Sequence, residues 1–244
     1  MLFIAVVIGV CMGSFGNVLI ERLPAGESIL GRSRCDGCRR SLSPVELVPL
    51  ASWLFLRGTC RSCGARIPAR VPLVEAWCGL LAAAAYLQSD GDLLRAACFF
   101  LALWALVLIA VVDLRTKTIP DALTFTVFVA GLASRWLADG TVPTYAPLLL
   151  AGFFLFQWVV SRGRWVGMGD VLLAAAIGVL VGTAHLALWT LLLAYGFGAS
   201  VTIVLLLAKR LRRGDMVPFG PFLVIGAYVA LFMGDMLAPV PTLF

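Results

Sequence analysis

Apolar stretches separated by short polar loops are the feature that most constrains this sequence. A helix that crosses a bilayer needs about 20 mainly apolar residues, because the hydrocarbon core offers its backbone no hydrogen-bond partners. Charged residues make up 13% of the chain, whereas soluble domains have about 25%. We therefore predict an all-α polytopic membrane protein with about eight spans, which begin near Leu2, Leu73, Leu94, Asp121, Tyr145, Val171, Leu186 and Phe219.

The first apolar stretch differs from a cleaved signal peptide. It has no basic segment before it and no small-residue cleavage site after it, and both features are typical of signal peptides. We predict a retained helix over residues 1–20, with its span ending at Ile20. Residues 21–72 are polar and rich in Arg, Gly and Pro, which predicts an extramembrane domain. The remaining spans form a core over residues 73–244.

The distribution of basic residues predicts the orientation in the membrane. If residues 21–72 are cytoplasmic, the loops on that side hold 17 of the 19 Lys and Arg residues, and Arg95 and Arg135 are the exceptions. Lys and Arg are retained in cytoplasmic loops, so we predict that both termini lie outside. The net charge of +6 is spread over several loops. This favours the lipid bilayer as a partner and argues against nucleic acid.

Four cysteines in the predicted cytoplasmic domain form two CxxC pairs, Cys35 with Cys38 and Cys60 with Cys63. A CxxC turn directs two thiolates at one ion, and two turns supply the tetrahedral ligand set of structural Zn²⁺. Two disulfides or a redox role are the alternatives, although disulfides rarely persist in the cytosol. Zn²⁺ binding would also supply folding free energy to a small domain with few bulky apolar side chains.

Two acids, Asp113 and Asp170, lie where the predicted topology places the cytoplasmic ends of spans. An ionisable group at membrane depth costs at least about 2.5 kcal/mol on insertion scales, which makes it a functional candidate. Asp170 could instead cap a helix, but a carboxylate at a helix C-terminus, as predicted for Asp113, is opposed by the helix dipole. Gly167 and Gly169 would let a substrate backbone approach Asp170 closely.

A proline-containing segment, residues 216–222, precedes the last span. Pro218 and Pro221 favour an irregular backbone there, which membrane depth tolerates only against protein or water. We predict that this segment, including Gly220, lines a site. A plain turn at the entry to a helix is the alternative.

In their order along the chain, these motifs resemble those of the type IV prepilin peptidases, membrane aspartic proteases of the GxGD type. The resemblance covers residues 13–24 with Asn17 and Arg22, both CxxC pairs, Asp113 with residues 119–121, residues 167–170, and residues 218–222. It implies that Asp113 and Asp170 are catalytic. It further implies cleavage of prepilin or pseudopilin precursors at the cytoplasmic face of the bacterial inner membrane, and N-methylation of the new N-terminus with S-adenosyl-L-methionine.

The chemistry of two neighbouring carboxyl groups agrees with that resemblance. Peptide hydrolysis needs a base to activate water and an acid to protonate the carbonyl oxygen, and a pair that shares one proton supplies both. Asn17 and Arg22 could contact substrate or cofactor, or could belong to a glycine-packed helix end with a topology-setting arginine.

Two other classes of protein compete with the protease. A transporter would use the two acids as an intramembrane relay, but no internal repeat is evident. A non-catalytic scaffold of the secretion machinery would use the cysteine domain to bind a partner. It would leave the pair of acids unexplained.

Overall fold

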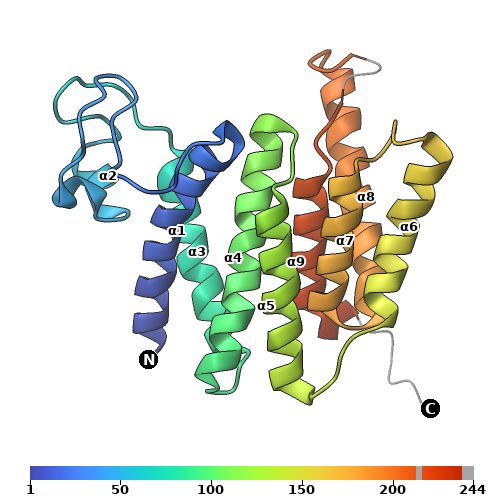
Figure 1. Cartoon of the computed structure of the whole chain (residues 1–244). Coiled ribbons are helices and arrows are strands. Elements are labelled where there is room, and N and C mark those ends of the chain that lie inside the picture. Colours follow the sequence, from blue (N-terminus) through green and yellow to red (C-terminus); the bar gives the residue numbers. More distant parts are fainter. Residues whose placement is uncertain (213–215, 238–244) are drawn as a thin grey trace. The chain divides into compact units, whose positions relative to one another are not determined.

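The computed structural model describes residues 1–212 and 216–237, and every α-helix in that part of the chain is shown in Figure 1. The chain divides into two compact units, Met1–Leu108 and Ile109–Phe244. The first unit contains α1 (Leu2–Ala25), a 3-10 helix (Pro44–Leu47), α2 (Ala51–Phe55), α3 (Arg70–Leu87) and the first part of α4 (Leu93–Thr116). The second contains the end of α4, α5 (Asp121–Asp139), α6 (Tyr145–Ser161), α7 (Met168–Val181), α8 (Ala184–Leu207) and α9 (Gly220–Leu237).

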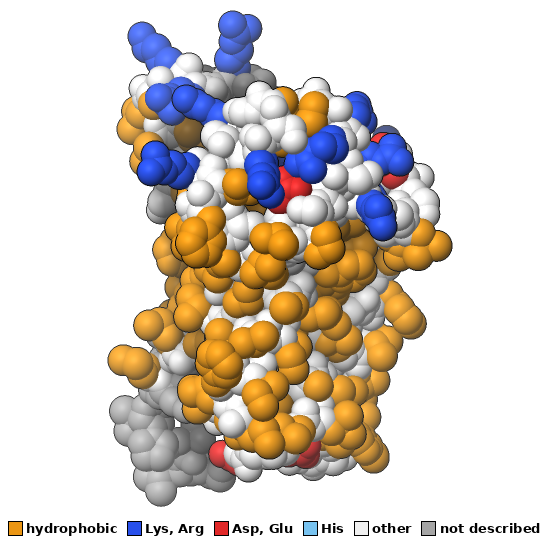
Figure 2. Space-filling model, turned by 90° about the vertical axis from the view of Figure 1, so that its left-hand side faces the viewer, with side chains coloured by type: hydrophobic (Ala, Val, Ile, Leu, Met, Phe, Trp, Pro, Cys, Tyr) orange, Lys and Arg blue, Asp and Glu red, His pale blue; other side chains and the backbone are white. Residues whose placement is uncertain are grey.

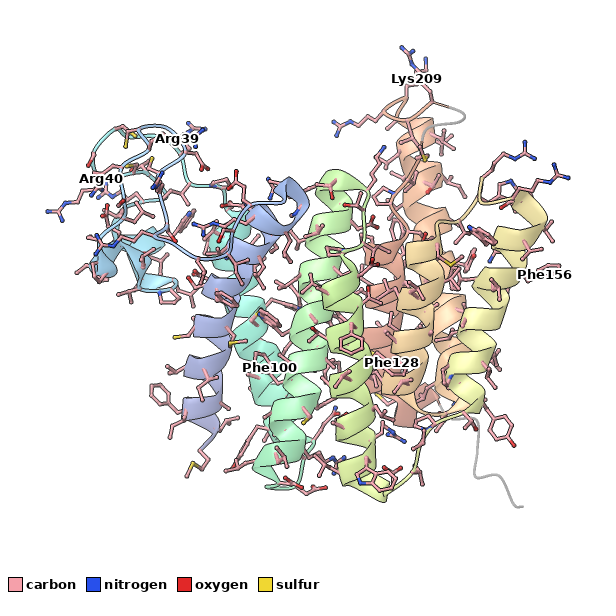
Figure 3. The ribbon with its side chains drawn as sticks, viewed as in Figure 1. Arg39, Arg40, Phe100, Phe128, Phe156 and Lys209 are labelled. Carbon is pink, nitrogen blue, oxygen red and sulfur yellow. The ribbon has the colours of Figure 1, made fainter. Side chains whose placement is uncertain are left out.

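The prediction of an all-helical protein is confirmed, and each predicted span begins within three residues of a helix start. Within the described residues, four helices, α1, α3, α4 and α8, are long and apolar enough to cross a membrane. Two others, α6 and α7, and the part of α9 over Gly220–Gly234 are apolar but shorter. Phe128 on α5 and Phe156 on α6 are 40% and 68% exposed (Figure 3). Lipid is the solvent that suits such outward-facing apolar side chains.

Helix α1 ends at Ala25, beyond the predicted end of the span at Ile20. Gly26 has φ 65°, in the left-handed region, and its N–H donates to the carbonyl of Leu23. A left-handed glycine is a common end of an α-helix, because glycine has no Cβ to clash there. The polar residues after Ile20 therefore form another helical turn, and Gly26 caps the helix.

Glycines bring α1 and α3 together in the first unit. A Cβ on Gly9 would lie 2.6 Å from the Cβ of Ala82, and one on Gly13 would lie 2.7 Å from the Cα of Glu75. Two glycines four residues apart allow close helix packing of the kind found in membranes. Trp104 of α4 donates from Nε1 to the carbonyl of Met12 at 2.9 Å. This packing fixes both ends of the cysteine-containing segment.

The surface of the first unit is segregated by side-chain type. Figure 2 shows hydrophobic side chains in a band, with Lys and Arg side chains gathered at one end of that face. The arginines of this unit lie mainly in residues 22–70, between α1 and the start of α3, whereas the loop after α3 contains Asp90 and Asp92. The band and the charged end correspond to a hydrocarbon layer and a basic membrane face.

In the second unit, one end gathers the parts of the chain that carry the candidate residues. The last turns of α4, α6 and α8 lie there together with the first turns of α5, α7 and α9 (Figure 1). Lys209 lies beyond α8 at this end (Figure 3). Basic residues lie in the last turn of α4 or follow α4, α6 and α8, at Arg115, Lys117, Arg162, Arg164, Lys209, Arg210 and Arg212. Arg213, which belongs to the predicted cytoplasmic charge, lies outside the described residues.

Candidate active site and metal centre

Asp113 lies in the last turns of α4 and is only 5% exposed. Its Oδ2 accepts a hydrogen bond of 2.9 Å from the backbone N–H of Gly220, the first residue of α9. A Cβ on Gly220 would lie 2.7 Å from that same oxygen. Glycine is therefore required for this close approach, which joins residues 107 positions apart.

Asp170 is the third residue of α7, and its Oδ2 accepts a hydrogen bond of 3.1 Å from the backbone N–H of Gly167. An acid in the first turn of a helix also interacts favourably with the helix dipole. Gly167 is the N-cap residue of α7, so Asp170 bonds the cap from inside the helix and is not the cap itself. This contact uses the Oδ2 atom of the carboxylate.

The second unit brings the first turn of α7, which carries Asp170, and the start of α9 to the end of α4, which carries Asp113. The first turn of α7 packs closely against the loop after α4. A Cβ on Gly169 would lie only 3.2 Å from the Cβ of Ile119. Pro218 is half-buried in the segment that leads to Gly220. Within the described part of the chain, neither Oδ1 atom accepts a hydrogen bond from protein. Among the described residues, the site thus presents one carboxyl oxygen without a protein donor on each acid.

The four cysteine sulfurs of the first unit lie within 4.8 Å of one another. The Sγ atoms of Cys35 and Cys63 are 3.7 Å apart, and all four thiols are free of disulfides. Tetrahedral zinc with Zn–S bonds of about 2.3 Å places its sulfurs about 3.8 Å apart. The geometry therefore fits one zinc ion and does not fit two disulfides.

The two CxxC turns have the same backbone structure. The N–H of Cys35 donates to the carbonyl of Arg40, and the N–H of Cys60 donates to that of Ala65. The fourth residue after each of these cysteines has positive φ, Arg39 at 58° and Gly64 at 69°. Backbone N–H groups of Cys63 and Ser62, with the thiol of Cys35, lower the pKa of Cys60 to about 6. The thiolate is the form that binds zinc.

Two family models and several curated proteins match the chain. Residues 7–89 match the Bacterial Peptidase A24 N-terminal domain, and residues 99–207 match the Type IV leader peptidase family. The Prepilin leader peptidase/N-methyltransferase of Bacillus subtilis is 36% identical, with 96% of this chain and 95% of that protein covered. The chain belongs to the type IV leader peptidase family.

Two other curated relatives match this chain over nearly its whole length. The Prepilin leader peptidase/N-methyltransferase of Stutzerimonas stutzeri is 34% identical, with 95% of this chain and 90% of that protein covered. The Type 4 prepilin-like proteins leader peptide-processing enzyme of Escherichia coli is 33% identical, with 94% and 93% covered. No solved structure matches the chain.

The remaining two candidates, Asn17 and Arg22, make contacts within the first unit of this leader peptidase. Asn17 donates to the carbonyl of Val71 at 3.1 Å and so links α1 to α3. Arg22 donates to the carbonyls of Ser28, Leu30 and Arg32 at 3.1 to 3.2 Å. These contacts support the structural interpretation of both residues. Asn17 also lines a cavity of about 180 Å³.

The acids near this cavity are largely paired within the protein. Glu75 is 4% exposed and accepts from the N–H of Leu50 at 2.7 Å. Glu21 pairs with Arg70 at 2.7 Å. Arg40 and Ser43 bond Glu46 and lower the pKa of its carboxyl to about 2. Among the described residues, Glu75 is bonded by a backbone N–H and is in no ion pair, so it lies in the cavity wall as a buried acid.

The sequence did not indicate the aromatic side chains that pack beside Gly220 and its bond to Asp113. The ring of Phe219 packs against Tyr195 of α8 with centroids 4.9 Å apart, and against Phe154 of α6 at 5.6 Å. Tyr195 in turn bonds Gln157 of α6. The available signal was an amide and a tyrosine inside apolar stretches, which often mark contacts between membrane helices.

Replacing Gly220 by Ala is expected to reduce the rate of precursor cleavage by about a hundredfold, because a displacement of about 1 Å in a reacting group has effects of that order. The added methyl group would displace the Asp113 carboxyl from the contact that holds it. We expect to see this loss in the initial rates of precursor cleavage. The rates are compared for variants that elute at the same volume as the wild type in size-exclusion chromatography. The matched control is Gly152→Ala on α6, where a Cβ meets no atom within 4 Å; similar rates for both variants would contradict the expectation.

Proposed function

We propose that this chain is a prepilin leader peptidase in which Asp113 and Asp170 form the catalytic pair. The observation that carries the proposal is that both acids lie in the segment that matches the leader peptidase family, and each is bonded by a backbone N–H of the second unit, Asp113 by Gly220 and Asp170 by Gly167. The enzyme removes the leader from type IV prepilins or pseudopilins. By similarity to relatives named for both activities, it also N-methylates the new N-terminal residue.

The proposed mechanism follows from the arrangement of the two carboxyl groups. One carboxylate removes a proton from water, and the water oxygen attacks the carbonyl carbon of the scissile peptide bond. The other carboxyl, in its protonated form, donates to the carbonyl oxygen. The tetrahedral intermediate then collapses: the first carboxyl gives its proton to the amide nitrogen as the C–N bond breaks, and the second takes a proton back from a hydroxyl of the new carboxylic acid. The N–H of Gly220 holds Asp113 and the N–H of Gly167 holds Asp170. Gly167, Gly169, Pro218 and Gly220 then form the active-site loops that hold the two acids.

The proposed topology places this chemistry at the cytoplasmic face of the bacterial inner membrane. We propose eight spans, the four long apolar helices and four others, with a retained helix at residues 1–20, a cytoplasmic domain at 21–72 and a protease core at 73–244. Both termini then lie outside. The basic residues after α4, α6 and α8 support this orientation.

Two groups complete the proposal. Structural Zn²⁺ is held by Cys35, Cys38, Cys60 and Cys63, whose sulfur spacing supports a tetrahedral ion. S-adenosyl-L-methionine is the methyl donor, as the names of the relatives imply. The cavity bordered by Asn17 and Glu75 is a candidate place for it, because a buried carboxylate suits a cationic ligand.

A transporter and a non-catalytic scaffold are not favoured by these relatives. The test is incubation of the purified protein with a prepilin precursor, with and without S-adenosyl-L-methionine, followed by mass measurement of the products. We expect a shortened precursor in both reactions and one added methyl group when the methyl donor is present. An intact precursor under conditions in which the protein is folded would overturn the proposal.

A further inference from the structure

Gln157 of α6 and Tyr195 of α8 form a hydrogen-bonded pair between two helices. The Nε2 of Gln157 lies 2.8 Å from the tyrosine hydroxyl oxygen, and its Oε1 lies 3.1 Å from it. The hydroxyls of Thr190 and Ser200 on α8 bond carbonyls of their own helix, at 2.8 and 2.7 Å. The Gln157–Tyr195 contact therefore differs from ordinary hydroxyl bonding within these helices.

The pair retains hydrogen-bonding capacity on an accessible surface. A glutamine amide offers two N–H donors and an oxygen with two acceptor positions. Its contact with one hydroxyl leaves at least one donor and one acceptor position free. Gln157 is half-buried and Tyr195 is 37% exposed. A bound group can thus reach the pair from outside the helices.

The surroundings of the pair are apolar. Val160, three residues after Gln157, is 54% exposed, and Leu192, three residues before Tyr195, is 64% exposed. Residues three apart lie on the same face of a helix. Phe156, next to Gln157 in the chain, is 68% exposed (Figure 3). A partner that fits this surface is apolar along most of its length and has polar groups only where it faces Gln157 and Tyr195.

Direct contacts connect the pair to Asp113. Tyr195 packs on Phe219, and the next residue, Gly220, donates to Asp113. A group bound at Gln157 and Tyr195 is therefore beside the segment that holds Asp113.

We propose that the precursor reaches the aspartates from the bilayer over the edge formed by α6 and α8, where Gln157 and Tyr195 hydrogen-bond the extended backbone beside its cleavage site. The inference rests on the proposed peptidase function. A transmembrane helix satisfies its own backbone, but the residues to be cut must be extended. Their N–H and C=O groups then cost free energy in apolar surroundings unless they find partners. An amide beside a hydroxyl offers both kinds of partner.

Site-specific photo-crosslinking tests the route of entry. The full chain with Asp113→Asn, which is expected to bind without cutting, carries p-benzoylphenylalanine in place of Phe156 and is illuminated in membranes containing the precursor. The matched control carries the same analogue in place of Phe125 on α5, which is 69% exposed. We expect a covalent adduct with the precursor from position 156 and none from position 125. No adduct at 156, or equal yields at both positions, would overturn the inference.

Cleavage of the same precursor by the wild type separates the two proposals. If the wild type cleaves and the adduct forms at position 125, the route of entry is wrong and the peptidase proposal stands. If the wild type does not cleave, the peptidase proposal fails, and the inference built on it fails too.

Kinetics distinguish substrate contact from a structural role of the pair. Gln157→Leu and Tyr195→Phe preserve bulk, and each is expected to raise KM for the precursor about three- to tenfold while kcat stays within about twofold. Ser200→Ala, which removes a hydroxyl that bonds its own helix, should leave KM unchanged. An unchanged KM in both pair variants, or a fall in kcat alone, would overturn the assigned contact.

Discussion

Replacing Asp113 or Asp170 by Asn is expected to reduce precursor cleavage by more than about a thousandfold, near the upper range for loss of a general acid or base. Asparagine has nearly the same shape, and its side-chain oxygen can keep the bond from Gly220 or Gly167. It cannot, however, exchange the proton that hydrolysis requires. Initial rates with a purified precursor, together with circular dichroism of each variant, check the expectation.

The double variant makes this prediction more specific. Residues that act as one unit have non-additive effects, so Asp113→Asn with Asp170→Asn should be no slower than either single variant. Asp139→Asn is the control, because that acid pairs with Arg135 at the other end of α5. A single variant with nearly normal cleavage would refute the assignment of that aspartate.

Replacing any one of Cys35, Cys38, Cys60 and Cys63 by Ser is expected to abolish binding of one zinc ion per chain. Structural zinc in small domains contributes apparent binding free energies of about 10 to 16 kcal/mol, which is folding free energy. The segment between α1 and α3 should therefore lose its protection from proteolysis and hydrogen exchange. Elemental analysis of freshly purified, reduced protein gives the metal content, and exchange measured by mass spectrometry locates the loss.

A cysteine outside the cluster provides the control for this prediction. Cys11 lies in α1 and is exposed, so Cys11→Ser should retain both the zinc and the protection of the cysteine-containing segment. Protein that contains no metal while its segment remains fully protected would show that the fold does not need zinc.

Local patterns in the sequence predicted the elements of this protein well. Apolar stretches of sufficient length fix helices, because lipid leaves the backbone no alternative. The spacing of the CxxC pairs anticipated the cluster of four sulfurs. The helix of the first span continues past Ile20, the last apolar residue of its run, and ends at Ala25, where the left-handed Gly26 caps it. Helix ends follow backbone capping as well as hydrophobicity.

Contacts between residues that are far apart in the sequence could not be predicted from local sequence patterns. The bond from Gly220 to Asp113 depends on how α4 and α9 pack, and nothing within a few residues of either position indicates it. The same holds for Gln157 and Tyr195, which are 38 residues apart. The three carbonyls that Arg22 binds depend on the path of the loop after α1. Such contacts follow from tertiary packing, which sequence periodicity does not encode.

The central claim, that Asp113 and Asp170 act together on one peptide bond, is tested most directly by an experimental structure of the Asp113→Asn variant in a bilayer with an uncleaved precursor. The account predicts that residues 113 and 170 lie at the same membrane level, on opposite sides of the scissile carbonyl. It also predicts that each lies within hydrogen-bond reach of that carbonyl or of one shared water, at about 2.6 to 3.2 Å. A structure with the two side chains at opposite membrane faces, or with either directed into lipid without a path to the other, would contradict it.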